Sequence, residues 1–313
     1  METIGIILVT ILLIAIGGIT VIYFFFPEFL YNFSIQQVRN LSGLVKKSIA
    51  IDGFNMVYLE GGKGDQYLLL IHGFGGNKDH WTLFSKFVSG KYHIISPDMP
   101  GFGESSKKED ESYDILSQVN RLKKFVDKLQ LKRFHIVGNS MGGHISAVFT
   151  IHFPEYILTL SLLDSAGITC LKQSEMLSML DKGENPLVVK TTEDFDRLME
   201  YAFVEQPIIP GQVKKMLAKE AIENNQLNSR IWKEIFDIHS TLENELNKIT
   251  APVLILWGDK DRILDVSCVP VFEQHIQHHT TIIMKNCGHS PMIEKPEETA
   301  KHIVHFIENS RVL

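Results

Sequence analysis

The stretch FHIVGNSMGGHISAV, residues 134–148, decides the fold class of this chain. Its centre, GNSMG at residues 138–142, has the form G-x-S-x-G, with an apolar run before it and a helix-like stretch after it. A serine on a tight turn from strand to helix points its hydroxyl outward, and the flanking glycines avoid collisions with the neighbouring strand and helix. The stretch therefore predicts a nucleophile elbow, with Ser140 as the candidate nucleophile.

Short apolar runs and helix-length segments alternate along most of the chain. Such runs are typical of strands buried on both faces of a parallel sheet, and the segment 115–129 between two of them has a clear helical period. Residues 47–51 and 55–59, joined by Asp52-Gly53, predict a β-hairpin. We therefore expect an α/β fold whose mostly parallel sheet is flanked by helices. The apolar runs cover residues 67–71, 93–96, 134–137, 158–163, 253–257 and 281–284.

The segment from Ser165 to about Thr250 interrupts this alternation. It shows no convincing strand and is rich in methionine, leucine, glutamate and lysine, which predicts a helical insertion over residues 165–245. Met176, Met179 and Phe203 are candidates to line a site for an acyl chain, because methionine adapts to irregular apolar ligands. The alternative is that these side chains form the insertion's own hydrophobic core.

The first residues differ in kind from the rest. Residues 4–26 carry no charge, and as a helix they would span about 34 Å, against about 30 Å of bilayer hydrocarbon. A cleavable signal peptide is the alternative, but it usually has a basic start and a shorter apolar core. We predict a transmembrane anchor followed by a connector over residues 27–44. The first basic residues after the anchor, Arg39, Lys46 and Lys47, place the catalytic domain on the cytoplasmic side.

Composition excludes several other classes of protein. The formal net charge is −6 and the basic residues form no stripe, so nucleic acid is not an expected partner. The three cysteines, Cys170, Cys268 and Cys287, lack C-x-x-C spacing, which argues against a disulfide framework and against a zinc site. We expect neither a metal nor an organic cofactor.

A serine nucleophile needs a base, and the base needs a carboxylate that fixes its tautomer. In a sheet protein with this elbow, the chain order is serine, acid, histidine. The loop after the run 253–257 contains Asp259 and Asp261, and the loop after the run 281–284 contains His289. Both loops follow strand ends, where α/β sites gather. His289 is therefore the candidate base, and either aspartate is within reach by sequence.

An oxyanion hole needs backbone N–H groups that face the oxygen on which charge develops. Met141, directly after the candidate nucleophile, supplies one such amide. Phe74, in the glycine-rich loop His72-Gly73-Phe74-Gly75-Gly76, is the candidate for the other. We expect His72 to have a structural role beneath this loop.

Five motifs together resemble those of the α/β-hydrolase superfamily over roughly residues 45–310. They are HGFGG at 72–76, DMPGFGES at 98–105, GNSMGG at 138–143, WGDKD at 257–261 and CGH at 287–289. The resemblance favours Asp261 as the acid. It divides the chain into core segments at 45–164 and 246–313, with the helical cap between them.

Within the superfamily the chain is most similar to membrane-anchored monoacylglycerol lipases with one N-terminal transmembrane segment. The resemblance implies a serine hydrolase that cleaves acyl-ester lipids through an acyl-enzyme. Two alternatives remain. One is a hydrolase of carbon–carbon bonds in ring-fission products, although those enzymes typically carry tryptophan after the histidine, where this chain has Ser290. The other is a ligand receptor that retains the fold.

Overall fold

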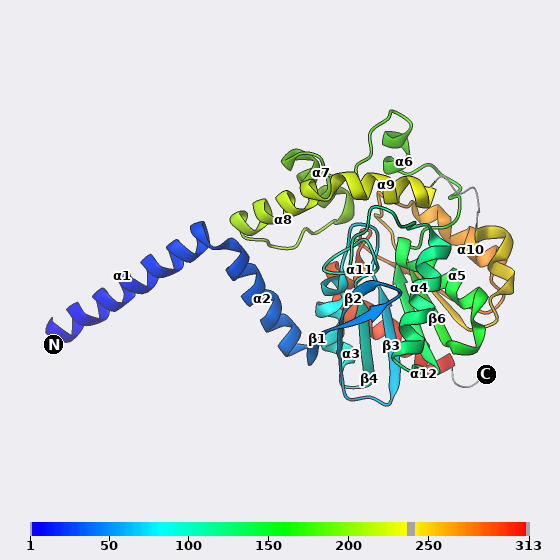
Figure 1. Ribbon diagram of the computed structural model, residues 1–313, viewed down its shortest axis with the longest axis horizontal. Coiled ribbons are helices and arrows are strands. Elements are labelled where there is room, and N and C mark those ends of the chain that lie inside the picture. The colour runs from blue at the N-terminus through cyan, green and yellow to red at the C-terminus, as the bar shows by residue number, and fades with distance from the viewer. Residues whose placement is uncertain (1, 237–241, 311–313) are drawn as a thin grey trace.

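The computed structural model describes residues 2–236 and 242–310. Its centre is an eight-stranded sheet in the order β1-β2-β4-β3-β5-β6-β7-β8 (Figure 1). The β1–β2 and β2–β4 pairs are antiparallel and the other pairs are parallel, so the predicted fold class is confirmed. The strands are β1 (Leu44–Ile51), β2 (Phe54–Gly61), β3 (Gln66–Ile71), β4 (Tyr92–Pro97), β5 (Phe134–Asn139), β6 (Ile157–Leu163), β7 (Val253–Gly258) and β8 (His279–Met284).

The predicted hairpin forms the antiparallel edge of the sheet. Ile51 pairs with Phe54, and the two residues between them, Asp52 and Gly53, both have positive φ, at 49° and 76°. This is the backbone of a two-residue hairpin turn, in which aspartate followed by glycine is a preferred pair.

Helices cover both faces of the sheet and bury one apolar layer on each. On one face, α4 (Ile115–Lys128) and α5 (Met141–His152) bury side chains that include Leu122, Phe125 and Ile145. On the other, α3 (Thr82–Val88) packs against α12 (Pro296–Asn309). Shorter elements complete the core: η1 (Lys78–Trp81), η2 (Pro154–Tyr156), η3 (Leu242–Lys248), η4 (Val266–Cys268), α10 (Val269–His275) and α11 (Pro291–Glu294).

Four α-helices lie between β6 and β7 in the chain and form the cap. They are α6 (Glu175–Leu180), α7 (Thr192–Ala202), α8 (Gly211–Glu223) and α9 (Asn225–Phe236), and the described part of this segment contains no strand. A capping box begins α7: the Thr191 hydroxyl accepts the Asp194 N–H, and the Asp194 carboxylate accepts the Thr191 N–H. In Figure 1 the cap helices lie over one end of the sheet.

The N-terminal helices extend away from the domain. Among the described residues, α1 (Glu2–Phe25) is the one helix long and apolar enough to cross a membrane, and it projects clear of the core (Figure 1). Pro27 begins α2 (Pro27–Leu41), which returns to the domain. There the Arg39 guanidinium donates two hydrogen bonds, of 2.7 and 2.5 Å, to the Asp79 carboxylate. Both of these side chains are more than nine-tenths buried, so the ion pair fixes α2 to the core.

The cysteines depart from the sequence prediction. Cys170 and Cys268 form a disulfide across 98 residues of sequence, so the expectation of no disulfide was wrong. The chain leaving β6 runs beside η4, where the Lys172 N–H donates to the Ser267 hydroxyl at 2.8 Å. This long-range contact carries no signature in cysteine spacing. Cys287 remains a buried free thiol.

Candidate active site

Ser140 lies on a strained turn between β5 and α5. Its φ of +55° and ψ of −121° are unusual for a residue with a side chain and match the predicted elbow. A Cβ on Gly138 would lie 2.1 Å from the Gly142 carbonyl oxygen, and one on Gly142 would lie 2.3 Å from that of Ile71. The G-x-S-x-G spacing is therefore a steric requirement of this turn.

His289 and Asp261 meet where β7 and β8 end. The His289 Nδ1–H donates to Asp261 Oδ2 at 2.7 Å, which leaves Nε2 available as a base. Asp261 Oδ1 accepts the N–H groups of Ile263 and Leu264 at 2.8 and 3.0 Å, so the whole carboxylate is held in place. Asp259 turns elsewhere and accepts the Asn286 N–H at 2.7 Å. Of the two aspartates predicted as alternatives, the structure brings Asp261 to the histidine.

Ser140 and His289 both line one cavity of about 440 Å³. Their exposed fractions are 9% and 6%, so the cavity rather than the open surface gives access to them. The cap contributes an apolar wall to the same cavity, and α2 contributes Tyr31, Ile35 and Val38. The apolar cap residues include Leu187, Val189, Phe195, Leu198, Met199 and Phe203.

Of the three cap residues expected to line the site, one does so in the structure. Phe203 lines the cavity, but Met176 and Met179 are not among its described lining residues. Met176 is 1% exposed within the main hydrophobic core, where its N–H donates to the Arg262 carbonyl. Sequence reasoning missed Phe195, although its i, i+4 spacing to Met199, which also lines the cavity, indicates one inward face of α7.

The glycine-rich loop lies directly against the elbow. A Cβ on Gly73 would lie 3.2 Å from the Ser140 Cβ, so the loop backbone approaches the candidate nucleophile closely. The next residue, Phe74, packs edge-on against Phe102 and Trp232. Met141 begins α5, where first-turn amides have no partner within the helix.

His72 supports this loop from below. It is fully buried; its Nδ1–H donates to the Gly73 carbonyl at 2.7 Å and its Nε2 accepts the Met99 N–H at 2.9 Å. Burial lowers the pKa of His72, so the ring stays neutral and can accept that bond. These contacts agree with the structural role expected for it.

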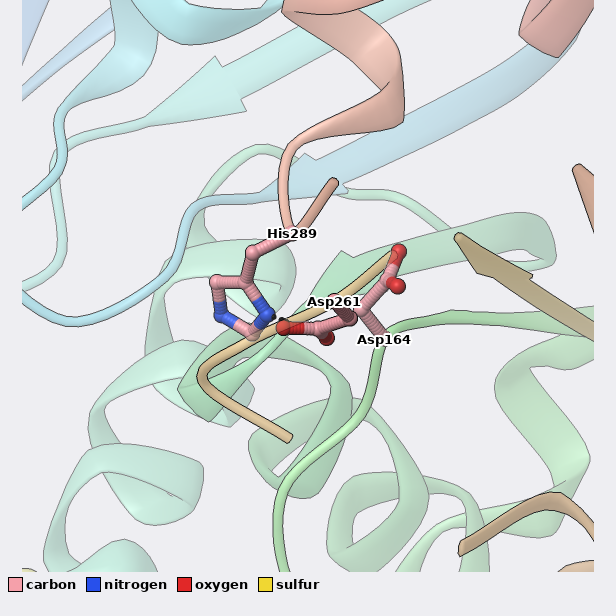
Figure 2. Close-up of side chains that lie close together, drawn as sticks. All are labelled: Asp164, Asp261 and His289. Carbon is pink, nitrogen blue, oxygen red and sulfur yellow. Dashed lines mark hydrogen bonds and ion pairs between the residues drawn. The ribbon is translucent and has the colours of Figure 1, made fainter. Parts of the chain in front are cut away.

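Asp164 is a third polar side chain beside the histidine and was not singled out from the sequence. One carboxyl oxygen of Asp164, one of Asp261 and one ring nitrogen of His289 lie within 4.8 Å of one another (Figure 2). Among the described residues this is the one group close enough to share a metal ion. The Asp261–His289 hydrogen bond already joins two of its donor atoms, so we describe the group as a histidine–carboxyl cluster and not as metal ligands.

Comparisons with known proteins agree with this geometry. Residues 66–296 match the model of the alpha/beta hydrolase fold family. Lipase 1 of Psychrobacter immobilis is 38% identical over 279 residues, which cover 87% of each chain. Monoacylglycerol lipase ABHD6 of Mus musculus is 31% identical over 77% of this chain and 75% of its own length.

A solved structure supports the same relationship. The crystal structure of a membrane phospholipase A, described as a bacterial virulence factor, superposes with a TM-score of 0.90 at 41% identity and covers 99% of both chains. The family match spans well over half of this chain, and the relatives are lipases. The chain therefore belongs to the α/β hydrolase family, as a lipase-type member.

Proposed function

We propose that this chain is a membrane-anchored serine hydrolase that cleaves monoacylglycerols or similar acyl esters. The observation that carries the proposal is the 2.7 Å bond from His289 to Asp261 at a cavity that Ser140 also lines. A base oriented by a carboxylate, beside a serine on an elbow, is the arrangement needed for acyl transfer.

In the proposed reaction, the Ser140 hydroxyl attacks the ester carbonyl carbon while His289 Nε2 takes the hydroxyl proton. The N–H groups of Phe74 and Met141 stabilise the oxyanion. His289 then returns the proton to the leaving alcohol, and an acyl-enzyme remains on Ser140. Water, deprotonated by His289, releases the fatty acid. Asp261 holds the imidazole tautomer and stabilises the imidazolium in both steps.

The shape and lining of the cavity support a lipid substrate. Its cap wall is mainly apolar, and its lining also includes residues of α2, the helix that directly follows the apolar helix α1. The Tyr23 hydroxyl at the end of α1 lies 3.4 Å from where a Cβ on Gly211, at the start of α8, would be. The cap and the end of the proposed span are therefore neighbours. We also propose the domain division 4–26, 27–44, 45–164, 165–245 and 246–313 expected from the sequence.

The side of the membrane is part of this proposal. The sequence predicts the cytoplasmic side, but the Cys170–Cys268 disulfide favours the opposite placement, because disulfides persist in oxidising compartments. We propose that the catalytic domain faces the oxidising side. Trypsin added to spheroplasts of an expressing bacterium should then digest it. Protection of the domain until the membrane is permeabilised would restore the cytoplasmic placement.

A substrate panel tests the function. The full-length chain in detergent would be given p-nitrophenyl esters of increasing chain length, monoacylglycerols, a diacyl phospholipid and a dienoate ring-fission product. We expect the highest kcat/KM with medium or long acyl esters. A sharp fall beyond about four carbons would mean an esterase for small substrates, because the apolar wall would then gain nothing from a longer chain. Consumption of the dienoate without ester cleavage, or binding without turnover, would overturn the proposal.

A further inference from the structure

Asp164 is a buried carboxyl group that the proposed reaction does not use. It directly follows β6, has a φ of +44° and is 0% exposed. Its Oδ1 accepts the Gly258 N–H at 2.8 Å, whereas its Oδ2 has no hydrogen-bond partner among the described residues. A buried carboxylate normally collects several donors or a cation, so this site is poorly built for a negative charge.

The neighbours of Asp164 strengthen this conclusion. Asp261 receives three hydrogen bonds, two from backbone amides and one from His289, and is the natural place for the negative charge of the pair. Figure 2 shows Asp164, Asp261 and His289 converging from three separate segments. Two carboxyl groups this close do not both ionise readily, because like charges repel in a medium of low dielectric constant.

The remaining ionisable groups around Asp164 do not supply a compensating charge. Burial raises the pKa of Asp164 well above its usual range, repulsion from Asp261 and Glu294 adds to this, and the Gly258 N–H opposes it only in part. Cys287 also faces this region, and burial raises the pKa of its thiol, which stays neutral. The charged groups that act most strongly on Asp164, Asp261 and Glu294, are both acidic.

We propose that Asp164 is a positioning residue held as a neutral carboxylic acid. It accepts the amide at the end of β7, and so fixes the turn that carries Asp261, while it adds no second charge beside His289. The proton stays on Asp164 and none is transferred from it during turnover. The link to catalysis rests on the proposed triad, whereas the protonation state can be measured without it.

The substitution Asp164→Asn tests the proposal, since the amide copies the shape of the neutral acid. An acid whose pKa is raised by folding loses stability as pH rises from its unfolded value of about 3.9 towards its folded value. The full-length D164N chain in detergent should therefore match the wild type in Tm at or below about pH 4 and exceed it increasingly towards pH 9. At pH 7 its kcat/KM should stay within about threefold of the wild type.

Two further measurements separate this role from a merely structural one. The infrared difference spectrum between wild type and D164N at pH 7 should contain the carbonyl band of a protonated carboxylic acid. Asp164→Ala leaves the Gly258 N–H without its acceptor, so kcat should fall about tenfold with KM unchanged. A D164N chain that fails to fold, or a spectrum with only carboxylate bands, would overturn the proposal even if the ester panel succeeds.

Asp98→Asn is the matched control. Asp98 is also 0% exposed, but it is bonded to the buried Lys78 ammonium at 3.0 Å and accepts the Lys78 N–H at 2.6 Å. Neutralising it removes one of three carboxylates around the buried Lys78 ammonium, the others being Asp79 and Glu104, so D98N should lower Tm at neutral and alkaline pH. Opposite signs for the two variants at pH 9 support a neutral Asp164, and equal losses contradict it.

Discussion

The two walls of the cavity that Ser140 and His289 line are built in different ways. The core wall consists of strand ends and tight loops, in which backbone geometry fixes Ser140, Asp261 and the loop at Gly73 to within hydrogen-bond or van der Waals distances. The cap wall consists mainly of apolar side chains from helices and their connections, such as Phe195 and Met199. The difference implies that the core determines the reaction, whereas the cap determines which substrates reach it.

The strongest test of this difference between the two walls is to remove the proposed nucleophile from the core wall. Ser140→Ala should remove nearly all turnover of a p-nitrophenyl ester. The remaining rate should be about 10³–10⁴-fold above that of the uncatalysed reaction in water, because substrate binding and the oxyanion hole are retained. The substitution should also abolish labelling by a fluorophosphonate. Ser178→Ala, on α6 in the cap, is the control and should behave as wild type. If the fluorophosphonate still labelled the Ser140→Ala chain, the nucleophile would be a residue other than Ser140.

The second-largest effect should come from the acid of the same wall. Asp261→Asn should lower kcat by about 10⁴-fold, because the amide favours the wrong tautomer of His289. Asp259→Asn is the matched control in the same loop and should change kcat little, because Asp259 bonds the Asn286 amide instead. Steady-state kinetics on one ester suffices. A larger loss in the Asp259 variant would reverse the assignment.

A substitution in the cap wall should change preference instead of chemistry. Met199→Ala shortens a side chain of the apolar wall and so enlarges the cavity. It should shift the ratio of kcat/KM between long and short esters by about tenfold, since each methylene in an apolar pocket contributes about 10-fold or more. Met179→Ala, which lies away from the cavity, should leave the ratio unchanged. If Met179→Ala shifted the ratio and Met199→Ala did not, Met179 would line the substrate site, as the sequence predicted.

The smallest effect on turnover should come from the bond that joins the two regions. Cys170→Ser removes the disulfide between the start of the cap segment and η4, and should lower the free energy of unfolding by about 2–4 kcal/mol, with little change in kcat at low temperature. Thermal unfolding of the wild type with and without reductant supplies the comparison. If neither Cys170→Ser nor the reductant changed the Tm, the disulfide would contribute no stability.

The same division separates what could be predicted from the sequence from what could not. Buried parallel strands appear as continuous apolar runs, and the elbow needs glycines at fixed spacing, so the sheet and the turn at Ser140 were predicted closely. The geometry also chose Asp261 over Asp259, as the family resemblance did. These features depend on local patterns that the chain repeats at each strand end.

The cap and the long-range contacts carry weaker local signals. Met176 and Phe195 are both apolar residues on helices, and only tertiary packing decides that the first enters the core and the second the cavity. The pairing of Cys170 with Cys268 depends on chain paths that spacing does not report. Asp164 was overlooked, although a lone acid directly after the apolar run of β6 was a usable signal.

The contact between the cavity and α2 has a consequence for how the rate depends on substrate. The cavity is lined in part by α2, the helix that follows the apolar span, through Tyr31, Ile35 and Val38. This contact offers a lipid a route from the bilayer into the cavity without a step in which it dissolves in water. Turnover in vesicles would then saturate with the mole fraction of substrate in the bilayer, and diluting the vesicles at constant composition would leave the rate per enzyme unchanged.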